Sequence, residues 1–141
     1  MSKASLDPVA LMAKASTACS SARTLLELGD TDGASNRAYY AMFDAARAAL
    51  LASGMTMGLD AGRTHSGLIA AFGKHLVKQG TIARELGRSF NRAHELRLAA
   101  DYSGDPIELS DATRLVHDAE EFVATLRGAS LTACPPPPHS G

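Results

Sequence analysis

The segment RAHELRLAADY, residues 92–102, combines two arginines, a histidine, two acids and a tyrosine within eleven positions. A helix turns by about 100° per residue, which places His94, Arg97 and Asp101 on one stripe. Such side chains occur at the solvated end of a helix, but they also suit a site that handles a phosphate. The contacts of the Arg97 guanidinium decide whether this segment is a solvated helix end or a phosphate site.

Arg97 lies four residues after Ala93 and seven after Phe90, where a bundle helix normally buries apolar side chains. A guanidinium at that border needs an acid, a carbonyl oxygen or an anion as its partner. Asp101, four residues later, can supply an ion pair within the helix. Exposed pairs of this kind indicate little about function, and spacing alone favours this simple interpretation. By the same reasoning Arg88, Arg92 and His94 fit a solvated surface.

A second polar stripe is predicted on the helix formed by residues 32–53. It consists of Arg37, Tyr40, Asp44 and Arg47, beside an apolar line that contains Tyr39. We expect the Tyr39 ring in the core, with its hydroxyl reaching a partner at the edge. If this helix packs against the helix that carries Arg97, the two stripes face a common cleft. Stripes on opposite sides of the molecule would contradict that hypothesis.

The elements that must position these residues are five helices, because alanine and leucine dominate and no segment reads as a strand. The apolar periodicity predicts helices over residues 7–28, 32–53, 64–78 and 82–102, and a fifth that starts near Ser110. Asp7, Thr81 and Ser110 are candidate N-caps, and Gly29, Gly54 and Gly104 mark helix ends. The predicted fold is all-α, an antiparallel helical bundle. The connection over residues 54–64 is the longest inside the bundle, which suggests mobility or function.

Composition is consistent with one helical domain over residues 1–128, followed by a tail over 129–141. The chain has 141 residues, 45% of them hydrophobic, and four consecutive prolines predict an extended, disordered tail. A formal net charge of -1 argues against strong, stable nucleic-acid binding. Two cysteines, no membrane-length apolar run and no signal peptide indicate a reduced cytoplasm and no membrane. No CxxC or HExxH spacing is present, so no metal site is predicted.

Three segments in order, GASNRAYYAMFDAARAALLASG, THSGLIAAFGKHLVKQG and RLAADY, resemble the HEPN domain family of prokaryotic helical proteins. The resemblance covers roughly residues 8–127. In particular the chain is similar to small single-domain members whose helix ends in R-x-x-A-D-Y. The AYYAMF and R-x-x-A-D-Y segments are fairly specific together, and each would be weak alone.

The resemblance implies a homodimer with a cleft at its interface, acting as a toxin or phage-defence component that cleaves RNA without a metal or cofactor. It also implies a nucleotidyltransferase-like antitoxin as a partner. The family motif is an arginine followed after four to six residues by a histidine. Arg97 matches the arginine, but Tyr102 occupies the histidine position, and tyrosine is a poor base near neutral pH. Arg88 and His94 satisfy the spacing earlier on the helix.

On this basis Arg97 is expected to bind phosphate, Tyr102 or His94 to move a proton or donate a hydrogen bond, and Asp101 to orient Arg97. The residues predicted to contact RNA or a nucleotide are Arg97, Arg92, Tyr40 and Arg37. The alternative is a non-catalytic module that dimerises and binds a nucleotide or a nucleotidyltransferase-like protein. A third interpretation is a scaffold whose polar stripes are ordinary dimer contacts.

Overall fold

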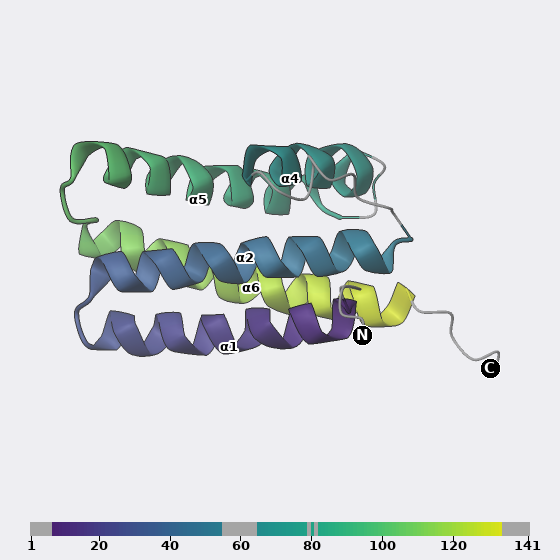
Figure 1. Ribbon diagram of the computed structural model, residues 1–141, viewed down its shortest axis with the longest axis horizontal. Coiled ribbons are helices and arrows are strands. Elements are labelled where there is room, and N and C mark those ends of the chain that lie inside the picture. Colours follow the sequence, from purple (N-terminus) through teal and green to yellow (C-terminus); the bar gives the residue numbers. More distant parts are fainter. Residues whose placement is uncertain (1–6, 55–64, 79, 81, 134–141) are drawn as a thin grey trace, which may run out of the picture.

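The computed structural model describes residues 7–54, 65–78, 80 and 82–133, which form a helical bundle with no strand among them. Its helices are α1 (Pro8–Glu27), α2 (Thr31–Ala52), α4 (His65–Phe72), α5 (Arg84–Ser103) and α6 (Leu109–Ala133), and a π-helical segment η1 (Gly73–Val77) extends α4. In Figure 1, α2 runs through the middle, with α1 and α6 on one side and α4 and α5 on the other. The predicted all-α bundle is confirmed. No described helix is long and apolar enough to cross a membrane.

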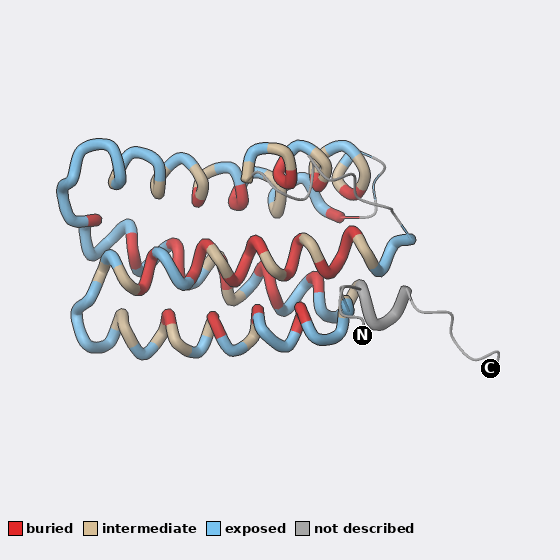
Figure 2. Tube along the Cα trace, viewed as in Figure 1, coloured by how far each residue is buried: buried red, intermediate tan, exposed pale blue. Residues whose placement is uncertain are grey.

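The central helix α2 is buried along most of its length, as Figure 2 shows. Many of its buried positions are alanines that are at most 1% exposed: Ala34, Ala38, Ala41, Ala45, Ala46 and Ala48. Short side chains let neighbouring helices approach closely, because the distance between helix axes depends on the residues at the contact. α2 can therefore pack against both halves of the bundle, and it lies at the centre of any site formed between them.

Three phenylalanines join α4, α5 and α6. The ring centre of Phe90 lies 5.7 Å from that of Phe72 and 5.2 Å from that of Phe122. All three side chains are at most 1% exposed. This packing fixes the rotation of α5, and it thereby decides which way the residues one and two turns beyond Phe90 point.

Hydrogen bonds at the helix ends confirm some predicted boundaries and correct others. Asp7 caps α1 by accepting a hydrogen bond from the Val9 amide at 3.0 Å. α2 begins at Thr31 rather than Asp32, because Asp30 is the cap and accepts a hydrogen bond from the Gly33 amide at 2.8 Å. Gly104, with φ of 76°, ends α5 in the left-handed conformation that glycine adopts readily.

Three other predicted boundaries were wrong or incomplete. α6 begins at Leu109 and the Ala112 amide bonds back to the Glu108 carbonyl at 2.9 Å, so Ser110 lies inside the helix and is not its N-cap. The fourth predicted helix starts at Arg84 instead of Ile82, since the Ile82 amide bonds back to the Leu76 carbonyl at 3.0 Å. The third contains a π-helical segment, in which the Lys78 amide reaches the Gly73 carbonyl at 2.8 Å. The predicted cap Thr81, the start of the third helix at residue 64 and the connection over residues 55–64 lie outside the described residues.

The predicted tail was also placed too early. α6 continues to Ala133, so residues 129–133 are helical. A single Gly128 does not end the helix, and the next proline along the chain is Pro135, which restricts only the residue directly before it. Residues 134–141 lie outside the described part of the chain.

Candidate functional site

The Arg97 side chain extends from α5 over two aromatic rings of α2. Its guanidinium carbon lies 5.4 Å from the ring centre of Tyr39 and 5.2 Å from that of Tyr40. The side chain is 23% exposed, and one of its nitrogens lies 3.5 Å from an Asp101 carboxylate oxygen. A cation over an aromatic face is attracted by the negative charge of the π system. Arg97 is therefore held at the seam between α2 and α5, with part of it still open to solvent.

A buried hydroxyl links two histidines next to this arginine. The Tyr39 hydroxyl oxygen lies 2.8 Å from Nδ1 of His65 and 3.4 Å from Nδ1 of His94. Tyr39 comes from α2, His65 is the first residue of α4 and His94 lies on α5. The centres of the two histidine rings are 6.2 Å apart, and both side chains are partly exposed. Three helices thus bring two imidazoles and a guanidinium around one phenol.

The surroundings favour the neutral forms of Tyr39 and His65. Burial raises the pKa of Tyr39, although the Arg97 cation opposes this shift. Burial lowers the pKa of His65, and Arg97 and His94 lower it further. At pH 7 we therefore expect a protonated phenol next to a neutral His65 imidazole, which can accept a proton at one ring nitrogen and donate one from the other.

Two hollows flank the cluster, and their charges differ. A cavity of about 300 Å³ beside Arg97 is lined by Asp32, Asn36, Arg97, Ala100, Asp101, Gly104, Asp105 and Ile107. A groove of about 480 Å³ between α4 and α5 is lined by Ser66, Ile69, Ala70, Gly73, Lys74, Lys78, Asn91 and His94. Within the described part of the chain the groove has two lysines and no acid, whereas three aspartates line the cavity. An anionic ligand would therefore approach more favourably from the groove, where His94 lies.

The structure brings four of the sequence-predicted site residues together: Arg97, Asp101, His94 and Tyr40. One contact joins the two polar stripes, that of Tyr40 with Arg97. The stripes do not share a common cleft, because Arg37 lines a groove with α1 residues and Asp44 lies near Lys14 of α1. Tyr102, one turn beyond Leu98, is 97% exposed. Asp44 and Arg47, further along the α2 stripe, approach each other at 3.9 Å.

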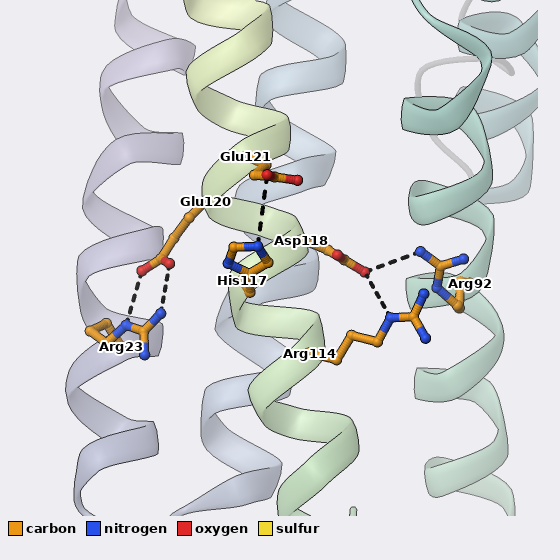
Figure 3. A network of polar contacts seen from close by, with 7 residues as sticks. All are labelled: Arg23, Arg92, Arg114, His117, Asp118, Glu120 and Glu121. Atoms are coloured by element: carbon orange, nitrogen blue, oxygen red, sulfur yellow. Dashed lines mark hydrogen bonds and ion pairs between the residues drawn. The ribbon is translucent and has the colours of Figure 1, made fainter.

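The other two predicted contact residues lie elsewhere. Arg92 bonds Asp118 of α6 at 3.2 Å, and Arg114 approaches the same carboxylate at 3.8 Å, as Figure 3 shows. Arg37 lines a groove with α1 residues on the opposite side of α2. Arg88, the arginine of the alternative spacing with His94, is 61% exposed and 3.5 Å from Glu85. These arginines therefore support packing or face solvent.

Sequence reasoning missed His65. The only signal was indirect, since this histidine follows the longest interior connection, for which function was one of two interpretations. Its partners Tyr39 and His94 are 26 and 29 residues away, beyond the reach of helical spacing. In the described part of the chain, no group of three or more histidine, cysteine or acidic side chains could hold a metal ion.

The fold and these contacts define a small all-α bundle with an arginine, two histidines and a tyrosine at the seam of three helices. A family model described as HEPN domain matches residues 9–129. The chain belongs to the HEPN family, as its sequence resemblance suggested.

Its relatives are bacterial and archaeal. The chain is 36% identical to an UPF0332 protein of Gloeobacter violaceus, over 80% of this chain and 87% of the relative. It is 39% identical to an UPF0332 protein of Thermotoga maritima, over 64% of each chain. It is 34% identical to the protein named "Putative toxin MJ0605" of Methanocaldococcus jannaschii, over 66% of each chain. The aligned region thus spans about two thirds of the last two relatives.

Proposed function

We propose that this HEPN protein is a metal-independent endoribonuclease that acts as a toxin or phage-defence component. The observation that carries the proposal is the position of the Arg97 guanidinium, which is fixed over Tyr39 and Tyr40 beside the imidazoles of His65 and His94. The name of the relative from Methanocaldococcus jannaschii supports the toxin class.

The chemistry uses the 2′-hydroxyl of RNA as the nucleophile, so the protein needs to supply only a base, an acid and a positive charge. One imidazole takes the proton of the 2′-hydroxyl while that oxygen attacks the adjacent phosphorus. The other imidazole gives a proton to the departing 5′-oxygen. Arg97 stabilises the negative charge that develops on the phosphate oxygens. The products are a 2′,3′-cyclic phosphate and a free 5′-hydroxyl.

Asp101 and Tyr102 have supporting roles in this proposal. Asp101 is 65% exposed and 3.5 Å from Arg97, so it can orient the guanidinium without neutralising a buried charge. Tyr102 is almost fully exposed on the same helix, where it can stack on an RNA base or donate a hydrogen bond to the strand. Of the predicted RNA contacts, Tyr40 faces Arg97, whereas Arg92 and Arg37 would contact only an extended substrate.

Purified protein incubated with single-stranded RNA in excess EDTA tests the proposal. We expect cleavage, and we expect Arg97→Ala to reduce it at least 100-fold, because one charged group that stabilises a transition state is commonly worth that factor. Arg88→Ala is the matched control, since Arg88 is an exposed arginine on the same helix and pairs with Glu85, one turn away. Equal activity of the two variants would reject the assignment of Arg97.

The homodimer implied by the family remains part of this proposal. Leu98 is 54% exposed and Tyr102 97% exposed, one turn apart on α5. Two copies of α5 packed about a two-fold axis would cover Leu98 and leave Tyr102 at the rim of the interface, open to RNA. Leu98→Glu should then turn a dimer into a monomer in analytical ultracentrifugation. A wild-type monomer at micromolar concentration would contradict dimerisation.

The second candidate function is a non-catalytic module that binds a nucleotide or a nucleotidyltransferase-like partner. The groove of about 480 Å³ between α4 and α5 favours it, because Lys74 and Lys78 and, among the described residues, no acid line it, which suits an anionic nucleotide. Tyrosine at the position of the family histidine favours it as well. Calorimetric titration with ATP, together with the RNA assay, separates the two functions. Binding without cleavage would support the module, and cleavage lost in Arg97→Ala would support the nuclease.

A further inference from the structure

The Tyr39 hydroxyl lies within hydrogen-bonding distance of both histidines of the proposed site. The Tyr39 side chain is fully buried, and its hydroxyl oxygen is 2.8 Å from Nδ1 of His65 and 3.4 Å from Nδ1 of His94. The rings of Tyr39 and each histidine are nearly parallel, with interplanar angles of 21° for His65 and 28° for His94. The phenol therefore bridges two imidazoles that come from different helices.

A phenol has one O–H to donate and lone pairs with which to accept, so it satisfies two ring nitrogens best when they differ. One Nδ1 must be bare and accept the phenol hydrogen. The other Nδ1 must carry a hydrogen and donate it to the phenol oxygen. In a neutral imidazole the remaining nitrogen, Nε2, then has the opposite character. One histidine presents an Nε2–H, and the other presents a bare Nε2.

We propose that Tyr39 holds His65 and His94 in opposite neutral tautomers and passes a proton between them, which makes one histidine the acid and the other the base of the same reaction. The inference rests on the proposed ribonuclease function for its catalytic half. Its structural half, the opposite tautomers, depends only on the hydrogen bonds of the Tyr39 hydroxyl with Nδ1 of His65 and Nδ1 of His94. Tyr39 is then a positioning residue, since it acts through the two imidazoles.

The proton transfers balance without any charged histidine. Before the reaction, His94 donates from Nδ1 to the Tyr39 oxygen, and Tyr39 donates to Nδ1 of His65. Nε2 of His94 takes the 2′-hydroxyl proton, and its Nδ1 hydrogen moves to Tyr39. The phenol hydrogen moves to Nδ1 of His65, whose Nε2–H protonates the departing 5′-oxygen. The P–O2′ bond forms, the P–O5′ bond breaks, and the two histidines have exchanged tautomers.

The exchanged state is ready for a second step. A bare Nε2 on His65 can now take a proton from water that attacks the cyclic phosphate at the position the 5′-oxygen has left. Nε2–H of His94 can return a proton to the 2′-oxygen, so the P–O2′ bond breaks and the starting tautomers are restored. The 3.4 Å contact to His94 is longer than an ideal hydrogen bond by about 0.5 Å, and catalytic contacts of this kind commonly tighten when substrate binds.

The charged and titratable groups around Tyr39 are compatible with a proton transfer in which both imidazoles stay neutral. Among the described residues, Arg97 from α5 and Tyr40 from α2 face Tyr39 in addition to the two histidines. Burial keeps the pKa of Tyr39 raised, so the phenol exchanges hydrogens without lasting as a phenolate. The lowered pKa of His65 keeps that ring neutral near pH 7. Phe43 and Phe90 complete the ring packing around Tyr39.

The first test is independent of activity. Long-range 1H–15N NMR spectra of the wild-type protein at pH 7.5 should show two histidines with opposite tautomers, or two with averaged shifts that reflect rapid exchange. Tyr39→Phe should give both rings the Nε2–H tautomer that free histidine prefers. Tyr40→Phe is the matched control, since it removes the hydroxyl of a neighbouring tyrosine whose ring also lies under Arg97, and it should leave the tautomers unchanged. Identical spectra for wild type and Tyr39→Phe would overturn the inference, and a circular dichroism melt of each variant verifies its fold.

The second test is the pH dependence of RNA cleavage. Two neutral imidazoles linked by Tyr39 predict a kcat/KM that rises with pH to a plateau and stays there up to pH 9. Without the phenol, the acid must be an imidazolium, so Tyr39→Phe should be slower by roughly 10- to 100-fold, with a bell-shaped profile. A bell-shaped wild-type profile, or a plateau retained in Tyr39→Phe, would overturn the relay while leaving the ribonuclease in place. Absence of cleavage would remove the catalytic half together with the proposed function, and the NMR result would still decide the tautomers.

Discussion

Replacing Arg97 by methionine removes its charge but keeps an unbranched side chain over the two rings of α2. The wild-type guanidinium carbon lies 5.4 Å from the Tyr39 ring centre and 5.2 Å from that of Tyr40. Each such contact contributes about 0.5–1 kcal/mol when partly exposed, so we expect a loss of about 1–2 kcal/mol of stability. By contrast, Asp101→Asn removes an intrahelical pair with an acid that is 65% exposed, which should cost only about 0.3–0.5 kcal/mol.

Urea unfolding followed by circular dichroism measures both losses. With a slope of about 2 kcal/mol per molar urea, the midpoint should fall by roughly 0.5–1 M for Arg97→Met and by roughly 0.2 M for Asp101→Asn. High salt should remove most of the Asp101→Asn effect, because it screens exposed pairs, and should leave most of the Arg97→Met effect.

Equal losses for the two variants would refute this reasoning. They would mean that Arg97 is held mainly by the ion pair with Asp101, the simpler interpretation that the sequence allows. The aromatic rings would then not position the guanidinium, and Arg97 would no longer be evidence for a preorganised phosphate-binding site.

Three further predictions concern pH, packing and metal. Because the pKa of His65 is lowered in the folded protein from its usual 6.5, the unfolded chain binds more protons, so stability should fall as the pH drops below about 6.5. The free energy of unfolding, measured by urea denaturation, should therefore differ less between pH 7.5 and pH 5.5 in His65→Gln than in the wild type. An equal difference in the two proteins would contradict the lowered pKa of His65. Phe122→Ala should cost about 3–5 kcal/mol of unfolding free energy, because its ring is 1% exposed and packs on Phe72 and Phe90; a loss below about 1 kcal/mol would show that the cluster repacks. RNA cleavage should be unchanged by excess EDTA, and activity restored only by added metal would contradict the proposed chemistry.

Local sequence patterns determined much of the helical framework. The buried residues of α2, α4 and α6 recur at helical spacing, and this periodicity is why the helices were predicted, as were the cap at Asp7 and the end at Gly104. The intrahelical approach of Arg97 to Asp101 also follows from a separation of four residues. The first and last residues of the helices were predicted less well. Two or three neighbouring residues can each act as the N-cap, and the sequence does not show that Asp30 is the one that accepts the hydrogen bond.

Only the tertiary structure decided which residues share the site. His65 lies 26 residues from Tyr39 along the chain, and His94 lies 55 residues from it, yet both reach the same hydroxyl. Helical periodicity relates residues within about two turns and says nothing of how one helix is rotated against another. That rotation is set by packing, above all by the contacts of Phe90 with Phe72 and Phe122. The same packing turned Arg92 toward Asp118 of α6 and Arg97 toward the rings of α2, although the two arginines are only five residues apart on one helix.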